Sequence, residues 1–224
     1  MPVYIQNNPQ TKIQSQSGSG GEGVAPETVL TPELGFVLDK SGSMQNLVNE
    51  AVAGFNTLVD EQRDLKPPAN FSLALFNDTV SSLYDAIPIA EAPPLTRELY
   101  RPAGGTALND AIGSMIQVIG KRAKRSTRVL IAILTDGAEN SSQTFSQANI
   151  LQMITYRRIT YDWQFVFIGP PHAASYALSI GIPQSNIVSF NADGEGVRLV
   201  LDRLSKSLRA YQLGDRRYAL CLRN

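Results

Sequence analysis

From Glu33 onward, short apolar runs alternate with amphipathic segments, and this alternation limits the fold more than any other feature of the chain. The run VLIAIL at 129–134 contains no polar residue, as a central strand covered on both faces requires. The segments between the runs carry apolar residues at the 3.6-residue spacing of a helix with one buried face. Runs and helical segments in this order are typical of repeated βαβ units and a mostly parallel sheet.

The order of the segments predicts a three-layer α/β domain. The apolar runs predict six strands, at 34–38, 71–76, 79–87, 129–134, 163–169 and 186–190. The amphipathic segments predict helices that begin near residues 44, 108, 145, 172 and 195. Only Asn77 and Asp78 separate the second and third runs, which favours an antiparallel hairpin with its reversed strand at a sheet edge. We therefore predict a Rossmann-like domain over residues 29–212, with a six-stranded, mostly parallel sheet, one antiparallel edge strand and helices on both faces.

Both ends of the chain differ from this pattern. Residues 1–28 are rich in Gln, Ser, Gly and Asn and contain few large apolar side chains, so we predict a flexible N-terminal tail. Residues 213–224 are assigned to a C-terminal extension. The N-terminus lacks the basic and apolar segments of a signal peptide, and no apolar run approaches the ~20 residues that cross a bilayer. The sequence therefore predicts a cytoplasmic protein without a membrane span.

Charge and metal-ligand content argue against several classes of function. Twenty basic and twenty acidic side chains give a net charge of zero, which does not support global attraction to nucleic acid. One cysteine, Cys221, and one histidine, His172, exclude a cysteine-rich metal site and argue against histidine-bound zinc. A local basic cluster is interpreted as a solvated helix end rather than a nucleic-acid contact. Its members are Lys121, Arg122, Lys124, Arg125 and Arg128.

Oxygen-bearing side chains gather at the ends of predicted elements. Asp39, Ser41 and Ser43 follow the first strand, Thr106 precedes the second long helix, and Asp136 follows the strand at 129–134. In a doubly wound sheet the functional crevice lies beyond the carboxyl ends of the parallel strands, so we expect these five side chains to meet there. Two carboxylates and three hydroxyls suit a hard cation such as Mg²⁺ or Mn²⁺, with Ca²⁺ as a further candidate. The sequence therefore predicts a divalent-metal site.

The spacing of the first three residues has a physical reason. Asp39, Ser41 and Ser43 put oxygen ligands on alternate residues of a turn, and Gly42 permits a tight backbone there. With only two carboxylates the ion's charge is balanced but not exceeded, so the metal stays electrophilic toward an acidic group from outside. A simpler reading stays open, in which one of these residues only caps the following helix. The polar residues at 139–142 are interpreted as a solvated loop.

These segments resemble the metal-ion-dependent adhesion site of von Willebrand factor type A (vWA) domains. DKSGSM at 39–44, GGT at 104–106 and ILTDG at 133–137 match its Asp-x-Ser-x-Ser, its distant Thr and its distant Asp at all five positions. The order of predicted elements agrees with that family over residues 30–212. The resemblance implies a domain that binds protein ligands through a divalent cation, with an Asp or Glu of the partner completing the coordination.

The resemblance also implies a role for each residue of the site. Ser41 and Ser43 would ligate the metal directly, and Asp39 would anchor it, in some states through water. Thr106 and Asp136 would exchange direct for water-mediated contact as the site opens or closes. In some members of the family this exchange is coupled to movement of the last helix, here 195–211.

We therefore predict a noncatalytic, cation-dependent protein-binding module that acts inside the cell as an adaptor or assembly factor. Relatives of similar size sometimes work with AAA-type ATPases, so such an ATPase is one candidate partner. Two alternatives stay open. Asp39 could be the nucleophile of a Mg²⁺-dependent phosphohydrolase, although that chemistry usually needs a second Asp where this chain has Ser41. The basic cluster at 121–128 could instead make the chain a scaffold that contacts nucleic acid.

Overall fold

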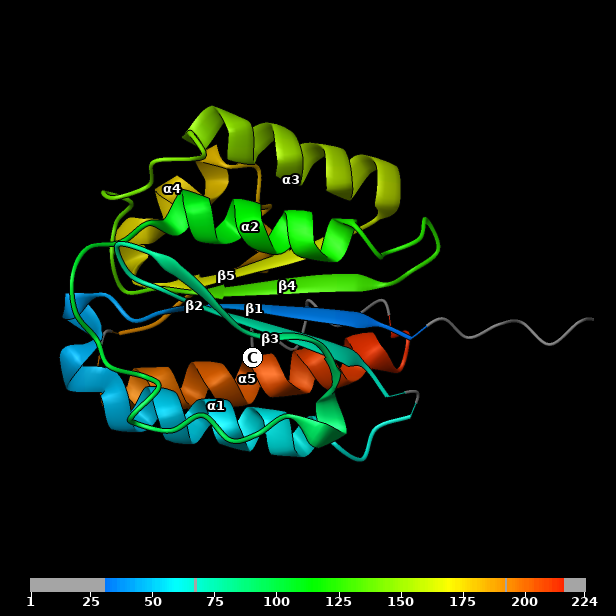
Figure 1. Cartoon of the computed structure of the whole chain (residues 1–224), viewed down its shortest axis with the longest axis horizontal. Coiled ribbons are helices and arrows are strands. Elements are labelled where there is room, and N and C mark those ends of the chain that lie inside the picture. The colour runs from blue at the N-terminus through cyan, green and yellow to red at the C-terminus, as the bar shows by residue number, and fades with distance from the viewer. Residues whose placement is uncertain (1–30, 67, 192, 216–224) are drawn as a thin grey trace, which may run out of the picture.

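The computed structural model, which describes residues 31–66, 68–191 and 193–215, confirms the predicted three-layer α/β fold. A six-stranded sheet of order β3-β2-β1-β4-β5-β6 lies between two helical layers (Figure 1). Neighbouring strands are parallel except β2 and β3, which are antiparallel, and β3 lies at an edge as the hairpin predicted. The predicted tail, residues 1–28, and most of the extension at 213–224 lie outside the described residues.

The observed elements follow the predicted order. The strands are β1 (Glu33–Asp39), β2 (Asn70–Phe76), β3 (Val80–Pro88), β4 (Val129–Leu134), β5 (Gln164–Gly169) and β6 (Ile187–Ser189). The α-helices are α1 (Val48–Gln62), α2 (Leu108–Gly120), α3 (Gln147–Tyr161), α4 (Ala174–Ser179) and α5 (Gly194–Gln212). Short 3₁₀ helices precede α1 (Gly42–Leu47) and α4 (Pro171–Ala173), and two others lie at Ile89–Glu91 and Gln184–Asn186. The helix predicted from residue 44 therefore starts as a tighter turn, which directly follows the end of β1.

Each face of the sheet has its own core. Helices α1 and α5 cover one face, and α2, α3 and α4 cover the other (Figure 1). Along β4, Leu130 and Leu134 belong to the core beneath α1 and α5, whereas Ile131 and Ile133 belong to the core beneath α2 and α3. The unbroken apolar run at 129–134 is thus explained, because successive side chains of a strand enter opposite cores.

One member of the predicted basic cluster is a structural residue. Arg122, just after α2, donates to the Glu33 carboxylate at 2.9 Å, to the Asp85 carboxylate at 2.7 Å and to the Ser72 hydroxyl at 2.8 Å. Glu33 is only 4% exposed, and its other carboxylate oxygen accepts a hydrogen bond from Asn70. Arg122 therefore connects β1, β2 and β3 and compensates a buried negative charge.

We expect Arg122→Ala to lower the free energy of unfolding by about 3 kcal/mol, because loss of one partner leaves a buried carboxylate without its cation. Urea unfolding followed by circular dichroism measures this change. Lys121→Ala, on the exposed neighbouring residue, is the matched control and should shift the free energy of unfolding by less than about 0.5 kcal/mol. Equal effects of the two substitutions would contradict a stabilising role for the guanidinium.

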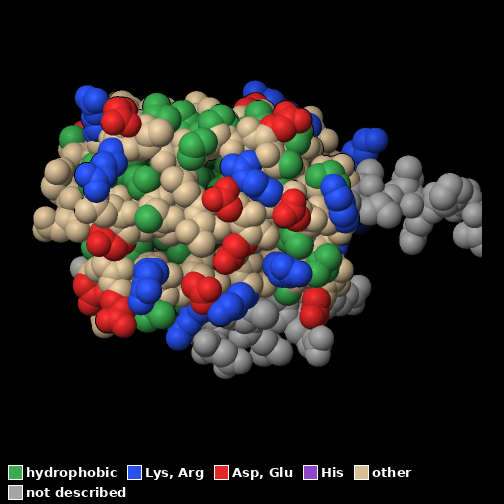
Figure 2. Space-filling model, turned by 90° about the horizontal axis from the view of Figure 1, so that it is seen from below, with side chains coloured by type: hydrophobic (Ala, Val, Ile, Leu, Met, Phe, Trp, Pro, Cys, Tyr) green, Lys and Arg blue, Asp and Glu red, His purple; other side chains and the backbone are tan. Residues whose placement is uncertain are grey.

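The described surface has mixed charge on the side of α1 and α5. Figure 2 views the molecule from that side and shows acidic and basic side chains interspersed, without a stripe of one sign. A surface of this kind does not have the electrostatic footprint of a protein that follows a phosphate backbone. Over the part of the chain that the structure describes, no helix combines the length and the hydropathy needed to cross a bilayer.

Candidate metal centre

The predicted site lies at the carboxyl end of the sheet, where two neighbouring parallel strands end. Strands β1 and β4 are paired up to Leu38 and Leu134, so the residues that follow them emerge side by side. The loop before α2 joins them, since the Gly42 N–H donates to the Gly104 carbonyl at 3.0 Å and the Ala103 N–H donates to the Lys40 carbonyl. Three segments far apart in the sequence therefore meet at one edge, as expected for residues beyond the carboxyl ends of parallel strands.

A chain of hydrogen bonds connects three of the five predicted side chains. The hydroxyls of Ser41 and Ser43 lie 3.1 Å apart, and the Ser43 hydroxyl donates to the Asp136 carboxylate at 2.6 Å. Neither serine caps the following 3₁₀ helix through its side chain, although Ser41 occupies the N-cap position. The capping reading therefore does not account for these two hydroxyls.

Thr106 approaches the same point from the loop before α2. A Cβ built at Gly137 would lie 3.0 Å from the Thr106 hydroxyl oxygen and 3.6 Å from that of Ser43. Both hydroxyls therefore face the space in front of Gly137, which a larger side chain at 137 would enter. Thr106 is 3% exposed, so its hydroxyl forms part of the floor of the site.

Asp39 lies deeper than the other four residues. Its carboxylate is fully buried and accepts hydrogen bonds from the Ser41 N–H at 2.6 Å and from the Thr135 hydroxyl at 2.5 Å. Its backbone carbonyl accepts a hydrogen bond from the Tyr100 hydroxyl. Asp39 therefore holds the turn that presents Ser41.

Burial also changes the acidity of both carboxylates. Desolvation raises the pKa of Asp39 from 3.8 to about 6, against the opposing hydrogen bonds from Thr135 and Ser41, and the negative charge of Asp136 raises it further. Desolvation likewise raises the pKa of Asp136, and the hydrogen bond from Ser43 opposes this shift. In the described part of the chain, neither carboxylate forms an ion pair with a Lys or Arg side chain. The site thus places two uncompensated acids near each other, which a bound cation would relieve.

The donor set fits a hard divalent cation better than a soft one. The five residues offer only carboxylate and hydroxyl oxygens, as Mg²⁺ and Mn²⁺ prefer. Among the described residues, no group of three or more His, Cys, Asp and Glu side chains is arranged to hold a metal ion. A cation here would therefore depend on the serine and threonine hydroxyls in addition to two carboxylates.

The loop after Asp136 is more ordered than the sequence suggested. Residues 139–142 form a partly exposed loop, as expected, but Glu139 also accepts hydrogen bonds from the N–H groups of Asn109, Ser141 and Ser142. The adjacent Asn140 binds the Thr106 backbone in both directions, accepting from its N–H at 2.8 Å and donating to its carbonyl at 3.1 Å. This loop therefore fixes the position of Thr106. In the sequence, the polar composition of 139–142 is the signal for this positioning role, and a loop without such a role has the same composition.

We expect Asn140→Ala to weaken Mg²⁺ affinity about tenfold, since groups that orient metal ligands typically have effects of this size. Isothermal titration calorimetry with MgCl₂ measures the change. Gln143→Ala in the same loop is the control, because only its backbone N–H is used, in a hydrogen bond to Asp110. Unchanged affinity in Asn140→Ala would show that the loop does not position Thr106 for the metal.

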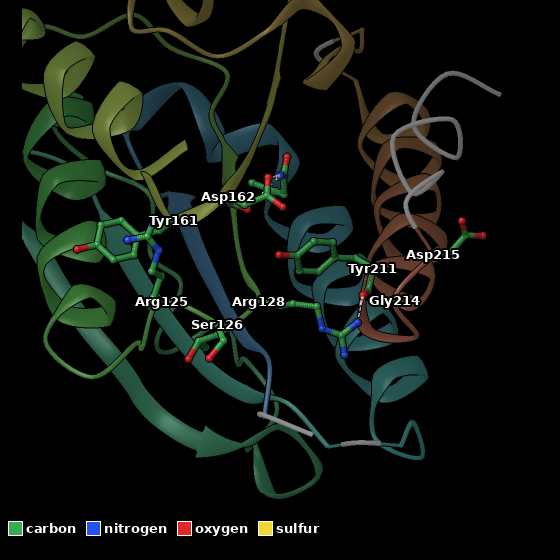
Figure 3. A pocket seen from close by; sticks show the side chains of 10 residues that line it. Arg125, Ser126, Arg128, Tyr161, Asp162, Tyr211, Gly214 and Asp215 are labelled. Carbon is green, nitrogen blue, oxygen red and sulfur yellow. Dashed lines mark hydrogen bonds between the residues drawn. The ribbon is translucent and has the colours of Figure 1, made fainter. Parts of the chain in front are cut away.

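A larger hollow of about 670 Å³ lies away from these residues, beside the end of α5 and the loops before β4 and β5. Figure 3 shows Arg125 and Arg128 on its wall, with their guanidinium groups pointing to opposite sides. Arg128 donates to the Tyr211 carbonyl at 3.1 Å, and Asp162 and Asp215 also line the hollow. Because the two arginines do not converge and two acids accompany them, the hollow does not have the character of a phosphate site.

No protein-family model and no curated protein matches the sequence. Solved structures do match. Proximal thread matrix protein 1 from the mussel byssus superposes with a TM-score of 0.61 and 13% identity, over 79% of this chain and 48% of that chain. A von Willebrand factor type A protein from Catenulispora acidiphila gives 0.56 and 16%, over 78% and 42%. The manganese-loaded TRAP protein of Plasmodium vivax gives 0.54 and 17%, over 75% and 71%.

These similarities establish the fold and not more. At 13% to 17% identity, the chain has a vWA-like Rossmann fold, as the resemblance implied. It spans less than half of the length of the mussel and Catenulispora proteins. Activity and partners must therefore be argued from the site of this chain.

Proposed function

We propose that this chain is a protein-binding module whose partner supplies an acidic side chain to a divalent cation, Mg²⁺ or Mn²⁺, at the carboxyl end of the sheet. Ser41, Ser43 and Thr106 would hold the ion together with Asp136, and Asp39 would anchor the turn beneath it. The ion would act as a Lewis acid toward a carboxylate of the partner. The observation that carries the proposal is the hydrogen-bonded chain from Ser41 through Ser43 to Asp136.

Two further observations support the proposal. Gly137 leaves open the space that the hydroxyls of Thr106 and Ser43 face, where an ion needs room. The manganese-loaded TRAP structure has the same fold, although its metal is a property of that protein. An AAA-type ATPase as partner, and an adaptor role in the cytoplasm, stay predictions of the resemblance.

The phosphohydrolase alternative is less well supported. The Asp39 carboxylate is 0% exposed, and both of its oxygens accept hydrogen bonds from inside the fold. A nucleophile must reach the phosphorus atom of its substrate, and this carboxylate does not face solvent. We expect no Mg²⁺-dependent hydrolysis of p-nitrophenyl phosphate above the buffer rate. Turnover by the wild type that disappears in Asp39→Asn would instead support the phosphohydrolase alternative.

Two of the five cations in the basic cluster at 121–128 make contacts within the fold, which weakens the nucleic-acid alternative. Arg122 is used by Glu33 and Asp85, and Arg128 by the Tyr211 carbonyl. The remaining cations of the cluster, Lys121, Lys124 and Arg125, are few for a phosphate-binding surface.

A pull-down from host lysate tests the proposal, with the purified chain presented in MgCl₂, in EDTA and as the Asp136→Ala variant. We expect a protein that is retained only by the wild type in MgCl₂. Asp64→Ala is the matched control, because Asp64 is an exposed acid just after α1, away from the loops that form the site. Retention of the same proteins in all three conditions would separate the interface from the metal.

A further inference from the structure

A second, smaller pocket borders the candidate metal centre. It measures about 270 Å³, and its lining includes Asn109, Gly137, Gln147, His172 and Tyr176. Gly137 belongs to both places, because it also lies in front of the hydroxyls of Thr106 and Ser43. A partner residue next to a metal-bound acid would therefore lie close to this pocket.

Asn109 presents an unused hydrogen-bond donor there. This residue, in the first turn of α2, is 5% exposed and lines the pocket. Its amide oxygen accepts a hydrogen bond from the Tyr176 hydroxyl, and its backbone N–H donates to Glu139. Among the described residues, the amide nitrogen of Asn109 has no acceptor. Because Asn109 lines the pocket, a ligand that supplies an acceptor there would pair with this amide nitrogen.

Gln147 presents the complementary acceptor. Its amide nitrogen donates to the Ser179 hydroxyl at 2.5 Å, whereas its amide oxygen accepts no hydrogen bond from the rest of the described chain. The carboxylate of Glu139, also on the lining, already accepts four hydrogen bonds, three from N–H groups and one from the Ser142 hydroxyl. Asn109 and Gln147 therefore offer a ligand one unpaired donor and one unpaired acceptor, both uncharged, and the lining also includes the methyl group of Ala173 and the imidazole of His172.

We propose that this pocket binds the side-chain amide of an asparagine or glutamine that adjoins the metal-binding acid of the partner. The amide oxygen would accept from Asn109, and the amide N–H₂ would donate to Gln147. An aliphatic side chain would leave both groups unpaired, whereas a side-chain amide pairs with both of them. This inference rests on the proposed function, since it places the partner's acid on the metal.

Blocked tetrapeptides test the inference by NMR titration of the ¹⁵N-labelled chain in MgCl₂. The probes are Ac-Gly-Asp-Gln-Gly-NH₂ and Ac-Gly-Gln-Asp-Gly-NH₂, their Asn counterparts, and matched peptides with Leu in place of the amide residue. We expect at least one amide peptide to bind about tenfold more tightly than its Leu counterpart, with a shift of the Asn109 side-chain resonances. Asn109→Ala should remove this preference and keep weak Mg²⁺-dependent binding. Gln147→Ala, at an exposed residue that does not threaten folding, should reduce the preference.

The outcomes distinguish failure of the pocket assignment from failure of the proposed function. Mg²⁺-dependent binding with equal affinity for amide and Leu peptides would overturn the pocket assignment and leave the metal-centre proposal standing. A preference that survives both Asn109→Ala and Gln147→Ala would also overturn the assignment. Binding that persists in EDTA, or absence of binding by every Asp-containing peptide, would overturn the proposed function and the pocket assignment together.

Discussion

In the Asp136→Ala variant we expect Mg²⁺ affinity to fall about 100-fold or more, with the fold retained. Asp136 is the half-buried carboxylate of the site, and it accepts a hydrogen bond from the Ser43 hydroxyl at 2.6 Å. Its removal takes away half of the negative charge available to the ion and leaves both hydrophobic cores intact. Loss of a direct ligand should exceed the 10-fold to 100-fold effect typical of groups that only orient ligands.

Thermal unfolding with and without MgCl₂ measures this loss. At 100 times its dissociation constant, a ligand of the native state adds about 2.7 kcal/mol of stability, which is roughly 5 to 10 °C for a domain of this size. We expect that increase in the wild type and in Asp64→Ala, and an increase of at most about 1 to 2 °C in Asp136→Ala at the same concentration. An equal increase in Asp136→Ala would place the cation elsewhere.

In Asp39→Asn we expect a metal-free protein that is more stable than the wild type by about 2 to 3 kcal/mol at pH 7.5. The difference between a pKa of about 6 in the fold and the ordinary 3.8 corresponds to about 3 kcal/mol against the ionised form. An amide avoids that cost, and its oxygen can still accept the hydrogen bond from the Ser41 N–H. The same substitution should weaken Mg²⁺ binding, because the anchoring charge is lost.

The raised pKa of Asp39 determines whether the stability of the metal-free protein rises or falls with pH. Between pH about 4 and pH about 6 the native protein retains a proton on Asp39 that the unfolded chain releases, so stability of the metal-free wild type falls as pH rises. Above pH 6 the full cost of the buried charge is present, and Mg²⁺ should stabilise the protein most there. Asp39→Asn should make this fall smaller, and the raised pKa of Asp136 accounts for the part that remains. Urea unfolding from pH 4 to pH 8 in EDTA measures both curves, and parallel curves would contradict a raised pKa for Asp39.

Stabilisation by Asp39→Asn would also show that the buried, ionised Asp39 carboxylate destabilises the metal-free fold. A buried carboxylate without a cationic partner in the described part of the chain is unfavourable for folding alone. Such a residue is expected where function requires it. The result would therefore link the instability of the metal-free protein to its capacity to bind a cation.

Sequence reasoning predicted the three layers and the mostly parallel sheet with its antiparallel edge strand, because these features depend on apolar patterns along the chain. The apolar run at 129–134 indicated burial on both faces, and the short connection at Asn77 and Asp78 favoured an antiparallel hairpin. The convergence of Ser41, Ser43 and Asp136 followed from strand ends alone. Whether these residues bind a metal stays a prediction.

The groups that support the site could not be predicted in the same way. Thr135 and Tyr100 contact Asp39 through positions that read as ordinary core or loop residues. Asn140 and Glu139 fix the loop around Thr106 through hydrogen bonds that depend on the exact loop path. Arg122 was read as part of a solvated cluster, and only the tertiary contact with Glu33 shows its structural role. Local sequence does not encode such contacts, because they join segments that are far apart along the chain.

The most direct test of a cation site at the carboxyl end of the sheet is a crystal of the chain soaked in MnCl₂, with anomalous scattering recorded at the manganese edge. We expect one anomalous peak between the hydroxyls of Ser41, Ser43 and Thr106 and the Asp136 carboxylate, and no such peak in Asp136→Ala. Absence of a peak there at millimolar Mn²⁺, or a peak only at another place, would contradict the assignment of this edge as a metal centre.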